Sequence, residues 1–408
     1  MSIVSWAINF ILQSAFVWMP ILLGIVFFHS YMAYMRKSFK QNSLEYVMLE
    51  INIPKDVFKS PQAMEWVIDV LWHLGGGVMD WKNRFWDGAI FYPSSLEIVS
   101  IEGNIYFFIR TSTKIAGVVK STIYSQYPNA EVNEVDDYTR YVPDYNKNGD
   151  TWSLYGAKYK LAKDDFLPIK TYVDYGLDVA VGKLEEEEKI DPITPLLEYL
   201  GTIRTGEQIW IQIVLQADVF SPWRKEAQAK IDEVMMRGEA PEDDSQFQQG
   251  AKLSFGEQEQ IKAIERSLSK HAFECVIRGL YIAKKENENK SIKGYFKGHI
   301  FKPFNSMYLN GIQKHDDTTS DWVWEDLTGL RYPAVRRRFF NDYINRAGLT
   351  EGLGKYLDFG LWHKRTKKMV LTSEELATLF HIPGRVSETV AVDRIDAKKS
   401  EAPANLPL

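Results

Sequence analysis

The chain has 408 residues, of which 45% are hydrophobic and 25% are charged, and its net charge is -5. This length exceeds one ordinary domain, and the composition is that of a folded globular protein. The acidic balance excludes a protein that coats itself with nucleic acid, so any nucleic-acid contact must be local. The single cysteine, Cys275, lies in an apolar run and is expected to be a buried small hydrophobe in a reducing compartment.

An apolar segment opens the sequence. Residues 15–28 are almost purely apolar, and extension back to Ile3 adds only four polar residues. A bilayer span needs about 20 such residues, so the pattern predicts a transmembrane helix. A cleaved signal peptide is the competing interpretation, but it needs a charged start and a small-residue cleavage site.

Basic residues flank this segment only on its C-terminal side, at Arg36, Lys37 and Lys40. By the positive-inside rule, the rest of the chain then lies in the cytoplasm. We therefore expect a single-pass protein of the inner (cytoplasmic) membrane, with residues 1–40 as anchor and basic flank and the C-terminal domains in the cytoplasm.

The next hundred residues alternate between strand and helix patterns. Two strands flank the tight-turn pair Glu102-Gly103, and the full order is strand, helix, strand, strand, helix, strand, over residues 45–53, 60–74, 96–101, 104–112, 114–127 and 131–136. This βαββαβ order is that of ferredoxin-like domains, and it predicts a first such domain over residues 41–140.

A second block repeats the plan less regularly over residues 150–372. Strands are predicted at 152–161, 169–175, 208–217 and 272–283, with helices at 193–203, 221–237 and within 290–309. An acidic, turn-rich insertion near 238–252 separates them. The expected fold class is α+β: one N-terminal transmembrane helix followed by two ferredoxin-like (βαββαβ) α/β sandwich domains with helical insertions, and then a C-terminal helix and Pro-rich tail at 373–408.

A search for catalytic chemistry returns negatives. The stretch Gly352 to Tyr356 imitates a phosphate loop but lacks its first glycine and its magnesium-binding Ser or Thr. Residues 144–150 imitate a calcium loop, but its twelfth position is Tyr155 instead of Glu. The histidines have no zinc-binding spacing, and there is no nucleophile elbow. We expect no cofactor, no metal and no catalytic residue, and therefore a protein that is not an enzyme.

Basic charge is local and late in the chain. Arg336, Arg337 and Arg338 precede two phenylalanines, and Lys364 and Arg365 follow Trp362. Such a mixture could contact the phosphates of nucleic acid or lipid. A solvated face or an intersubunit salt-bridge surface would explain the same residues.

The C-terminal part resembles a known family. The motif Met369-Val-Leu-Thr-Ser-Glu-Glu-Leu-Ala-Thr-Leu-Phe-His-Ile-Pro-Gly384 is similar to the segment that precedes the motor domain in type IV secretion and conjugation ATPases of the HerA/FtsK class. The central stretches from Ile190 to Leu200 and from Gly206 to Ile213 resemble the same N-terminal regions. The resemblance covers most of residues 40–408, but the sequence holds no Walker A or Walker B motif, so ATP hydrolysis is not carried over.

The resemblance implies a membrane-anchored, non-catalytic component of a type IV secretion-like or DNA-transfer apparatus that scaffolds or regulates a separate P-loop motor ATPase. It points to a partner-binding surface formed by Leu376, Leu379, Phe380, His381 and Pro383. Expected partners are the lipid bilayer, the motor ATPase, other secretion components and further copies of the chain. The alternative is a membrane-tethered module that binds nucleic acid, lipid or another envelope protein. A weaker third hypothesis is an enzyme with an unfamiliar site.

Overall fold

The computed structural model of the chain describes residues 3–52, 59–75, 82, 92–142, 151–178, 191–219, 221–238, 253–319, 331–349 and 367–383. The chain divides into two compact units, each treated by itself. The first comprises Met1–Glu45, Val78–Ile90 and Thr350–His363, and the second comprises Tyr46–Gly77, Phe91–Leu349 and Lys364–Leu408.

The described part of the first unit is essentially one long helix, α1 (Ile3–Ser43), with Pro20 in its interior. Its stretch Gln13–Met32 has a mean hydropathy of 1.7, and 6% of it is buried. Large apolar side chains such as Phe16 and Phe27 are exposed along it. Among the described helices, only α1 has the length and composition to cross a membrane, as a membrane anchor or a signal sequence does.

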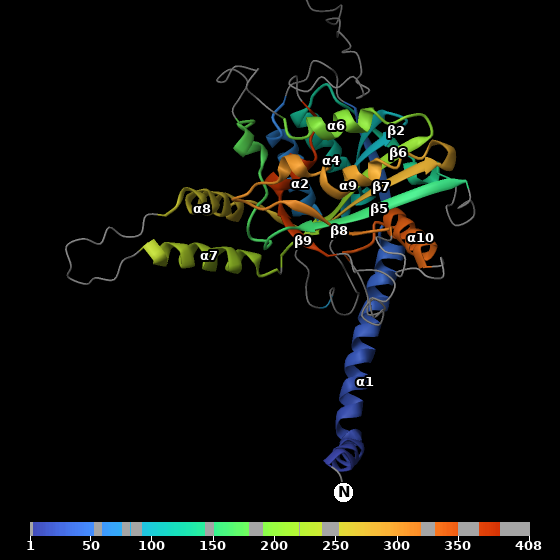
Figure 1. Ribbon diagram of the computed structural model, residues 1–408, viewed down its shortest axis with the longest axis vertical. Coiled ribbons are helices and arrows are strands. Elements are labelled where there is room, and N and C mark those ends of the chain that lie inside the picture. The colour runs from blue at the N-terminus through green and yellow to red at the C-terminus, as the bar shows by residue number, and fades with distance from the viewer. Residues whose placement is uncertain are drawn as a thin grey trace, which may run out of the picture. The chain divides into compact units, whose positions relative to one another are not determined.

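The second unit is built on one antiparallel sheet of nine strands, in the order β4-β1-β3-β2-β6-β7-β5-β8, with β9 pairing β7 (Figure 1). The strands are β1 (Tyr46–Asn52), β2 (Ser94–Ile101), β3 (Asn104–Ser112), β4 (Glu131–Val135), β5 (Trp152–Leu161), β6 (Glu207–Ala217), β7 (Ala272–Lys284), β8 (Ile312–Asp317) and β9 (Met369–Thr372). Both predicted α+β domains therefore contribute strands to a single sheet, joined where β2 pairs with β6.

Side-chain alternation explains how this sheet is buried on both faces. In β6, Ile209, Ile211 and Ile213 face the larger hydrophobic core, whereas Trp210 faces a second cluster on the opposite face. The predicted turn at Glu102-Gly103 is confirmed, and both residues have positive φ, 54° and 93°. A glycine suits the second position because it has no Cβ to strain that conformation.

One face of the sheet carries most of the helices. Helices α2 (Gln62–Gly75), α4 (Thr113–Gln126), α6 (Thr194–Gly201), α9 (Ile292–Gly298) and α12 (Ser373–Leu379) all bury side chains in the larger core. Helix α10 (Arg331–Ile344) instead packs Phe339, Phe340 and Tyr343 into the second cluster. The sheet is therefore the middle layer between α10 and these five helices (Figure 1).

An inserted pair of helices, α7 (Trp223–Gly238) and α8 (Phe255–Leu268), connects β6 to β7. They lie side by side (Figure 1) and share a small core with Trp223, Ile231 and Ile264. Helix α7 agrees with the predicted charged helix, but α8 was not predicted. Its start is a capping box between Ser254 and Glu257, which is a recognisable sequence signal.

The predicted strand at 169–175 is wrong. Tyr172–Tyr175 form a short 3-10 helix, η2, because the side chains of Thr171 and Asp174 cap each other's backbone and Gly176 closes the turn in the left-handed region. Three further predictions lie outside the described residues: the calcium-like loop at 144–150, the acidic insertion at 239–252 and the phosphate-loop imitation at 352–356.

Candidate functional site

The C-terminal segment singled out by the resemblance lies inside the sheet unit. Strand β9 pairs with the first four residues of β7, from Ala272 opposite Thr372 to Cys275 opposite Met369. Thr372 then caps α12 through a capping box with Glu375. The segment thus extends the sheet and turns directly into a helix above it.

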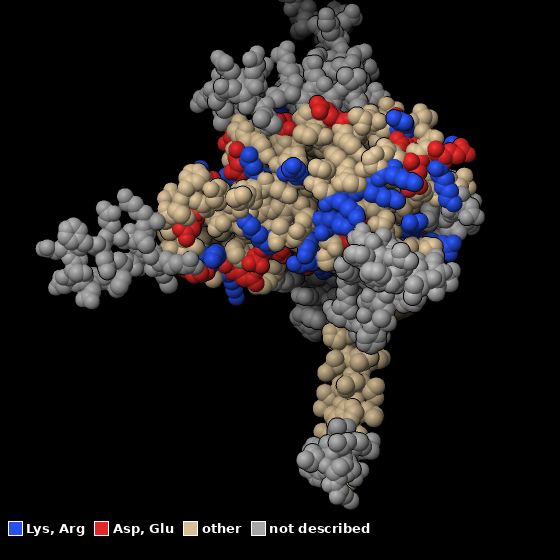
Figure 2. Space-filling model, viewed as in Figure 1, with Lys and Arg blue, Asp and Glu red and all other residues tan. Residues whose placement is uncertain are grey.

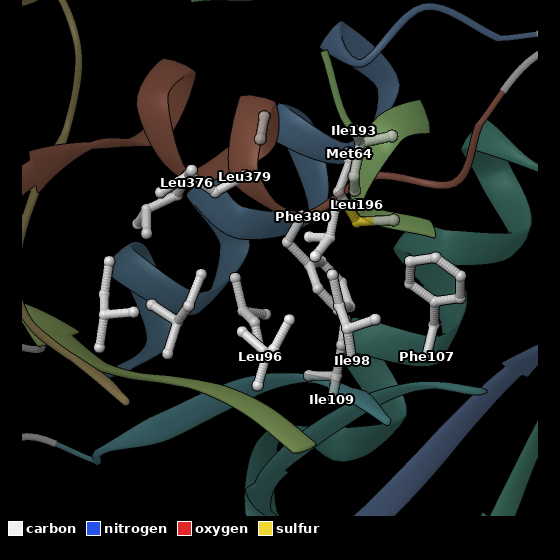
Figure 3. Close-up of a cluster of buried hydrophobic side chains, with 14 of the residues drawn as sticks. Met64, Leu96, Ile98, Phe107, Ile109, Ile193, Leu196, Leu376, Leu379 and Phe380 are labelled. Carbon is white, nitrogen blue, oxygen red and sulfur yellow. The ribbon is translucent and has the colours of Figure 1, made fainter. Parts of the chain in front are cut away.

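The predicted partner-binding residues are all buried. Leu376, Leu379, Phe380 and His381 are at most 2% exposed, and Pro383 is buried as well. Figure 3 shows the first three beside Leu96, Ile98 and Phe107 of the sheet and Met64 of α2. The ring centroids of Phe380 and Phe107 lie 5.8 Å apart in an edge-to-face arrangement. These side chains are core in this conformation, so a partner could reach them only if the segment left the sheet.

A buried ion pair fixes the end of the segment. His381 Nε2 lies 3.0 Å from Asp191 Oδ1, and His381 Nδ1 lies 2.9 Å from the carbonyl oxygen of Ala377. Burial would lower the pKa of His381, but the Asp191 carboxylate raises it above its usual value. Burial would raise the pKa of Asp191, and the imidazolium lowers it. Both ring nitrogens are engaged, so this pair holds the chain in place.

Glu65 of α2 lies at the centre of a second polar contact with the segment. Its Oε1 accepts from Lys270 Nζ at 2.7 Å and from Ser373 Oγ at 3.2 Å, and its Oε2 accepts from the Tyr172 hydroxyl at 2.6 Å. Four chain segments far apart in sequence therefore meet at one carboxylate.

Glu374 extends this network. Its Oε1 accepts from Thr171 Oγ1 at 2.6 Å and from Arg266 Nε at 2.9 Å, and Arg266 also reaches Asp174 at 2.9 Å. Burial raises the pKa of Glu374, against the opposing effects of Thr171, Arg266 and Lys270. We call Glu65, Arg266, Lys270 and Glu374 the latch cluster.

Glu375 is buried beside the latch cluster. Its Oε1 accepts from the backbone N–H of Ile169 at 2.9 Å, and its Oε2 accepts from the backbone N–H of Thr372 at 2.8 Å. Burial raises the pKa of this carboxyl to about 7, although both hydrogen bonds lower it. Its protonation therefore changes near neutral pH.

The contacts in this arrangement attach the C-terminal segment to the rest of the sheet unit. Within the described ranges, no group of three or more His, Cys, Asp or Glu could hold a metal ion. The carboxylates of the latch cluster face cations and hydroxyls of the protein itself, and Glu375 beside them faces backbone N–H groups. Such a buried, paired network specifies where a segment docks.

The predicted phosphate-binding residues lie elsewhere. Arg336, Arg337 and Arg338 belong to α10, where Arg337 is exposed and the other two are half-buried. Lys364 and Arg365 lie outside the described residues. The structure therefore does not bring the arginines to the buried C-terminal residues, because α10 packs on the opposite face of the sheet.

Sequence reasoning missed the acidic partners of this site. Glu65 stands on the apolar face of α2, next to Met64 and Ile68, and an acid within an apolar stripe is a signal that could have been noticed. Asp191 precedes Pro192, just before the predicted helix at residues 193–203. Its pairing with His381, 190 residues away, has no local signal.

A comparison with known families gives one match. A family model described as a domain of unknown function (DUF8128) matches residues 68–395. No curated protein matches the chain. Because the matched residues include most of the sheet unit and the buried C-terminal segment, the chain belongs to the DUF8128 family, a domain of unknown function.

Proposed function

We propose that this chain is a membrane-anchored scaffold without enzymatic activity, which holds its sheet unit at the inner face of the cytoplasmic membrane. The observation that carries the proposal is the exposed apolar stretch Gln13–Met32 of α1. The helix continues to Ser43, and the first strand starts at Tyr46. Such a short connection suits a protein that keeps a folded unit close to a bilayer.

We also infer that the sheet combines two ferredoxin-like halves. Read inward from one edge of the sheet, the first four strands lie in the order β4-β1-β3-β2. Read inward from the opposite edge, the next four lie in the equivalent order β8-β5-β7-β6. Each half has the succession strand, helix, strand, strand, helix, strand along the chain, with α7 and α8 inserted in the second half. A duplicated unit of this kind offers a broad rigid platform.

In its narrower form, the proposal is that this platform anchors or regulates a separate motor ATPase in a type IV secretion-like or DNA-transfer apparatus. Support comes from the sequence resemblance of residues 369–384. The latch cluster adds a physical condition, since Leu376, Leu379 and Phe380 are accessible only when β9 and α12 leave the sheet.

The first test is purification of the full-length chain from its native membranes in mild detergent, with mass spectrometry of proteins retained at high salt. A stoichiometric P-loop ATPase is the expected companion. A chain that is stripped from membranes by carbonate would contradict the anchor, and a clean eluate would contradict the motor partner.

A disulfide lock tests whether release of the segment is required. Ser373 N donates to His271 O, so these two residues form a hydrogen-bonded pair of the antiparallel ladder between β9 and β7. Hydrogen-bonded and non-hydrogen-bonded pairs alternate along such a ladder, which makes Glu274 and Val370 a non-hydrogen-bonded pair with Cα atoms about 4.5 Å apart. That spacing allows a disulfide. In a Cys275→Ser background, the variant with Glu274→Cys and Val370→Cys should fail to co-purify with the ATPase when its disulfide is oxidised. Reduction of the disulfide should restore co-purification. Equal recovery in both states would exclude release.

The alternative function is a tethered binding module unrelated to a motor. The observation that favours it is the exposed Arg337 on α10, flanked by two half-buried arginines. Guanidinium groups suit phosphate oxygens because they donate two parallel hydrogen bonds. This alternative predicts salt-sensitive binding of DNA or anionic vesicles that is lost when Arg336, Arg337 and Arg338 are all changed to Gln.

A further inference from the structure

A lysine-rich surface lies on the helix-bearing face of the sheet, opposite the face on which α10 carries the predicted arginines. Between Asn289 and His315 the sequence holds five lysines and no acidic residue. Helix α9 buries Ile292 and Phe296 and turns Lys293 and Lys297 outward, with Lys297 exposed. Figure 2 shows Lys and Arg side chains gathered where α9, β5 and β8 lie, with acidic side chains mostly toward the margins.

Neighbouring elements extend this surface. Lys302 is exposed on the short 3-10 helix Lys302–Phe304, and Lys314 lies on β8, which contacts α9. Lys170 joins them because its backbone N–H donates to the carbonyl oxygen of Phe304 at 3.2 Å. We call Lys170, Lys293, Lys297, Lys302 and Lys314 the lysine face.

Carboxylates balance part of this charge. Lys293 lies 3.5 Å from Glu288, and Lys314 pairs with the buried Asp317. Lys170 instead lies over the ring of Tyr175, with Nζ 3.8 Å from the centroid. The surface is therefore rich in lysine although the whole chain carries a net charge of -5.

The side chains around the lysine face indicate what it recognises. The phenylalanines of this stretch, Phe296, Phe301 and Phe304, are buried in the core, and the half-buried Tyr295 of α9 is already stacked on Tyr199, with ring centroids 3.4 Å apart. Proteins that bind single-stranded nucleic acid combine basic grooves with rings that are free to stack on bases. Lysine ammonium groups act as point charges and need no planar partner. These features favour a diffuse anionic surface over a nucleic acid.

We propose that the lysine face binds the anionic lipid headgroups of the membrane that anchors the chain. This inference rests on the proposed function, which puts the sheet unit beside the bilayer. Residues 33–43 of α1, between the apolar stretch and β1, would extend only about 16 Å as a helix. Electrostatic attraction to a leaflet decays over roughly 8 Å at physiological salt, so a short tether is what makes a modest basic surface effective.

Lysine footprinting on the full-length chain tests this directly. The chain is placed in nanodiscs of phosphatidylcholine alone, or in nanodiscs that also contain roughly 30% phosphatidylglycerol and therefore have an anionic surface. Acetylation of each lysine is then followed by mass spectrometry. We expect Lys293, Lys297 and Lys302 to react about threefold more slowly in the anionic discs, and 0.5 M salt (a Debye length of roughly 4 Å) to remove the difference. Lys225 on α7 and Lys262 on α8 are exposed and serve as internal controls.

A triple variant, Lys293→Glu, Lys297→Glu and Lys302→Glu, provides the matched control. Because Lys297 and Lys302 are exposed and Lys293 is half-buried at the surface, the fold should tolerate it. Its remaining Lys170 and Lys314 should lose their protection in anionic discs.

Three outcomes overturn the inference. Equal reactivity in both lipid compositions excludes headgroup binding. Protection in neutral discs by added DNA, without protection by anionic lipid, assigns the surface to nucleic acid instead. A chain that leaves the discs on carbonate washing overturns the membrane anchor and this inference together, whereas a retained chain with unprotected lysines overturns only the inference.

Discussion

Glu97 on β2 and Arg346, just beyond α10, form a buried ion pair in which two guanidinium nitrogens face two carboxylate oxygens. Nε lies 3.1 Å from Oε1, and Nη2 lies 3.2 Å from Oε2. Glu97 is fully buried and Arg346 is 4% exposed. Burial would raise the pKa of Glu97, but Arg346 and the hydrogen bonds around it keep that pKa below its usual value. This pair ties the end of α10 to the centre of the sheet.

Removal of one partner of this pair should be costly. Arg346→Met leaves the Glu97 carboxylate buried without its cation, which costs about 3–5 kcal/mol in the free energy of unfolding. The double variant with Glu97→Gln should be less destabilised than the single one, since the fully buried Glu97 charge is gone and only the partly exposed Asp137 carboxylate, which also pairs with Arg346, lacks its cation. Urea denaturation of the full chain in detergent, followed by tryptophan fluorescence, measures both. A single variant within about 1 kcal/mol of wild type would contradict the central role of the pair.

Two glycines in adjacent strands make room for one aromatic ring on each face of the sheet. A Cβ at Gly156 of β5 would lie 2.4 Å from the Phe339 ring of α10, and one at Gly279 of β7 would lie 2.6 Å from the Phe296 ring of α9. Gly156→Ala should therefore loosen α10, and Gly279→Ala should loosen α9, each at a cost of about 1–3 kcal/mol. Hydrogen exchange should show faster exchange in one helix and not in the other. The two variants serve as each other's control.

The pH dependence of stability should follow Glu375. Its folded pKa of about 7 lies above the unfolded value of about 4.3. Between these values the folded state binds more protons than the unfolded one, so stability falls as pH rises through this window, by up to about 4 kcal/mol. The raised pKa values of Glu374 and His381 act in the same direction.

Glu375→Gln tests this assignment. The variant has no carboxyl at position 375. Its free energy of unfolding should therefore change less than that of wild type between about pH 5 and about pH 8, even if its absolute stability is lower. Glu226→Gln on the exposed part of α7 is the matched control and should keep the wild-type slope. An unchanged slope in Glu375→Gln would assign the pH dependence to other groups.

The C-terminal segment should contribute to stability as a core element. Leu376→Ala opens a cavity beside the sheet and should cost about 2–5 kcal/mol, because Leu376 is fully buried. Met307→Ala is a suitable control, since that side chain is 88% exposed. Equal thermal stability of the two variants would mean that the segment spends much of its time away from the sheet.

The sequence was informative where the signal is local. The strand and helix periodicity of residues 45–136 correctly predicted β1 to β4, α2 and α4, and the Glu102-Gly103 pair marked its hairpin. The strand predicted at 169–175 rested on the β-branched residues of that stretch. The structure forms a short helical turn there instead, because the side chains of Thr171 and Asp174 cap it. The surface predicted from Leu376 and Phe380 remains a prediction, and their burial beside β2 and β3 depends on contacts hundreds of residues apart. No periodicity reports on such contacts.

The position of β9 has a consequence for biosynthesis. Its partner strand β7 begins at Ala272, about a hundred residues earlier, and the latch cluster reaches back to Glu65 in α2. Until translation passes Ile382, the growing chain does not have the complete β9 and α12, so the apolar side chains of Phe107 and Leu96 lack the cover that this segment gives them. Contacts of such long sequence separation form late, and exposed strand edges invite aggregation. We therefore expect the nascent chain to depend on a chaperone near the ribosome exit until β9 and α12 emerge.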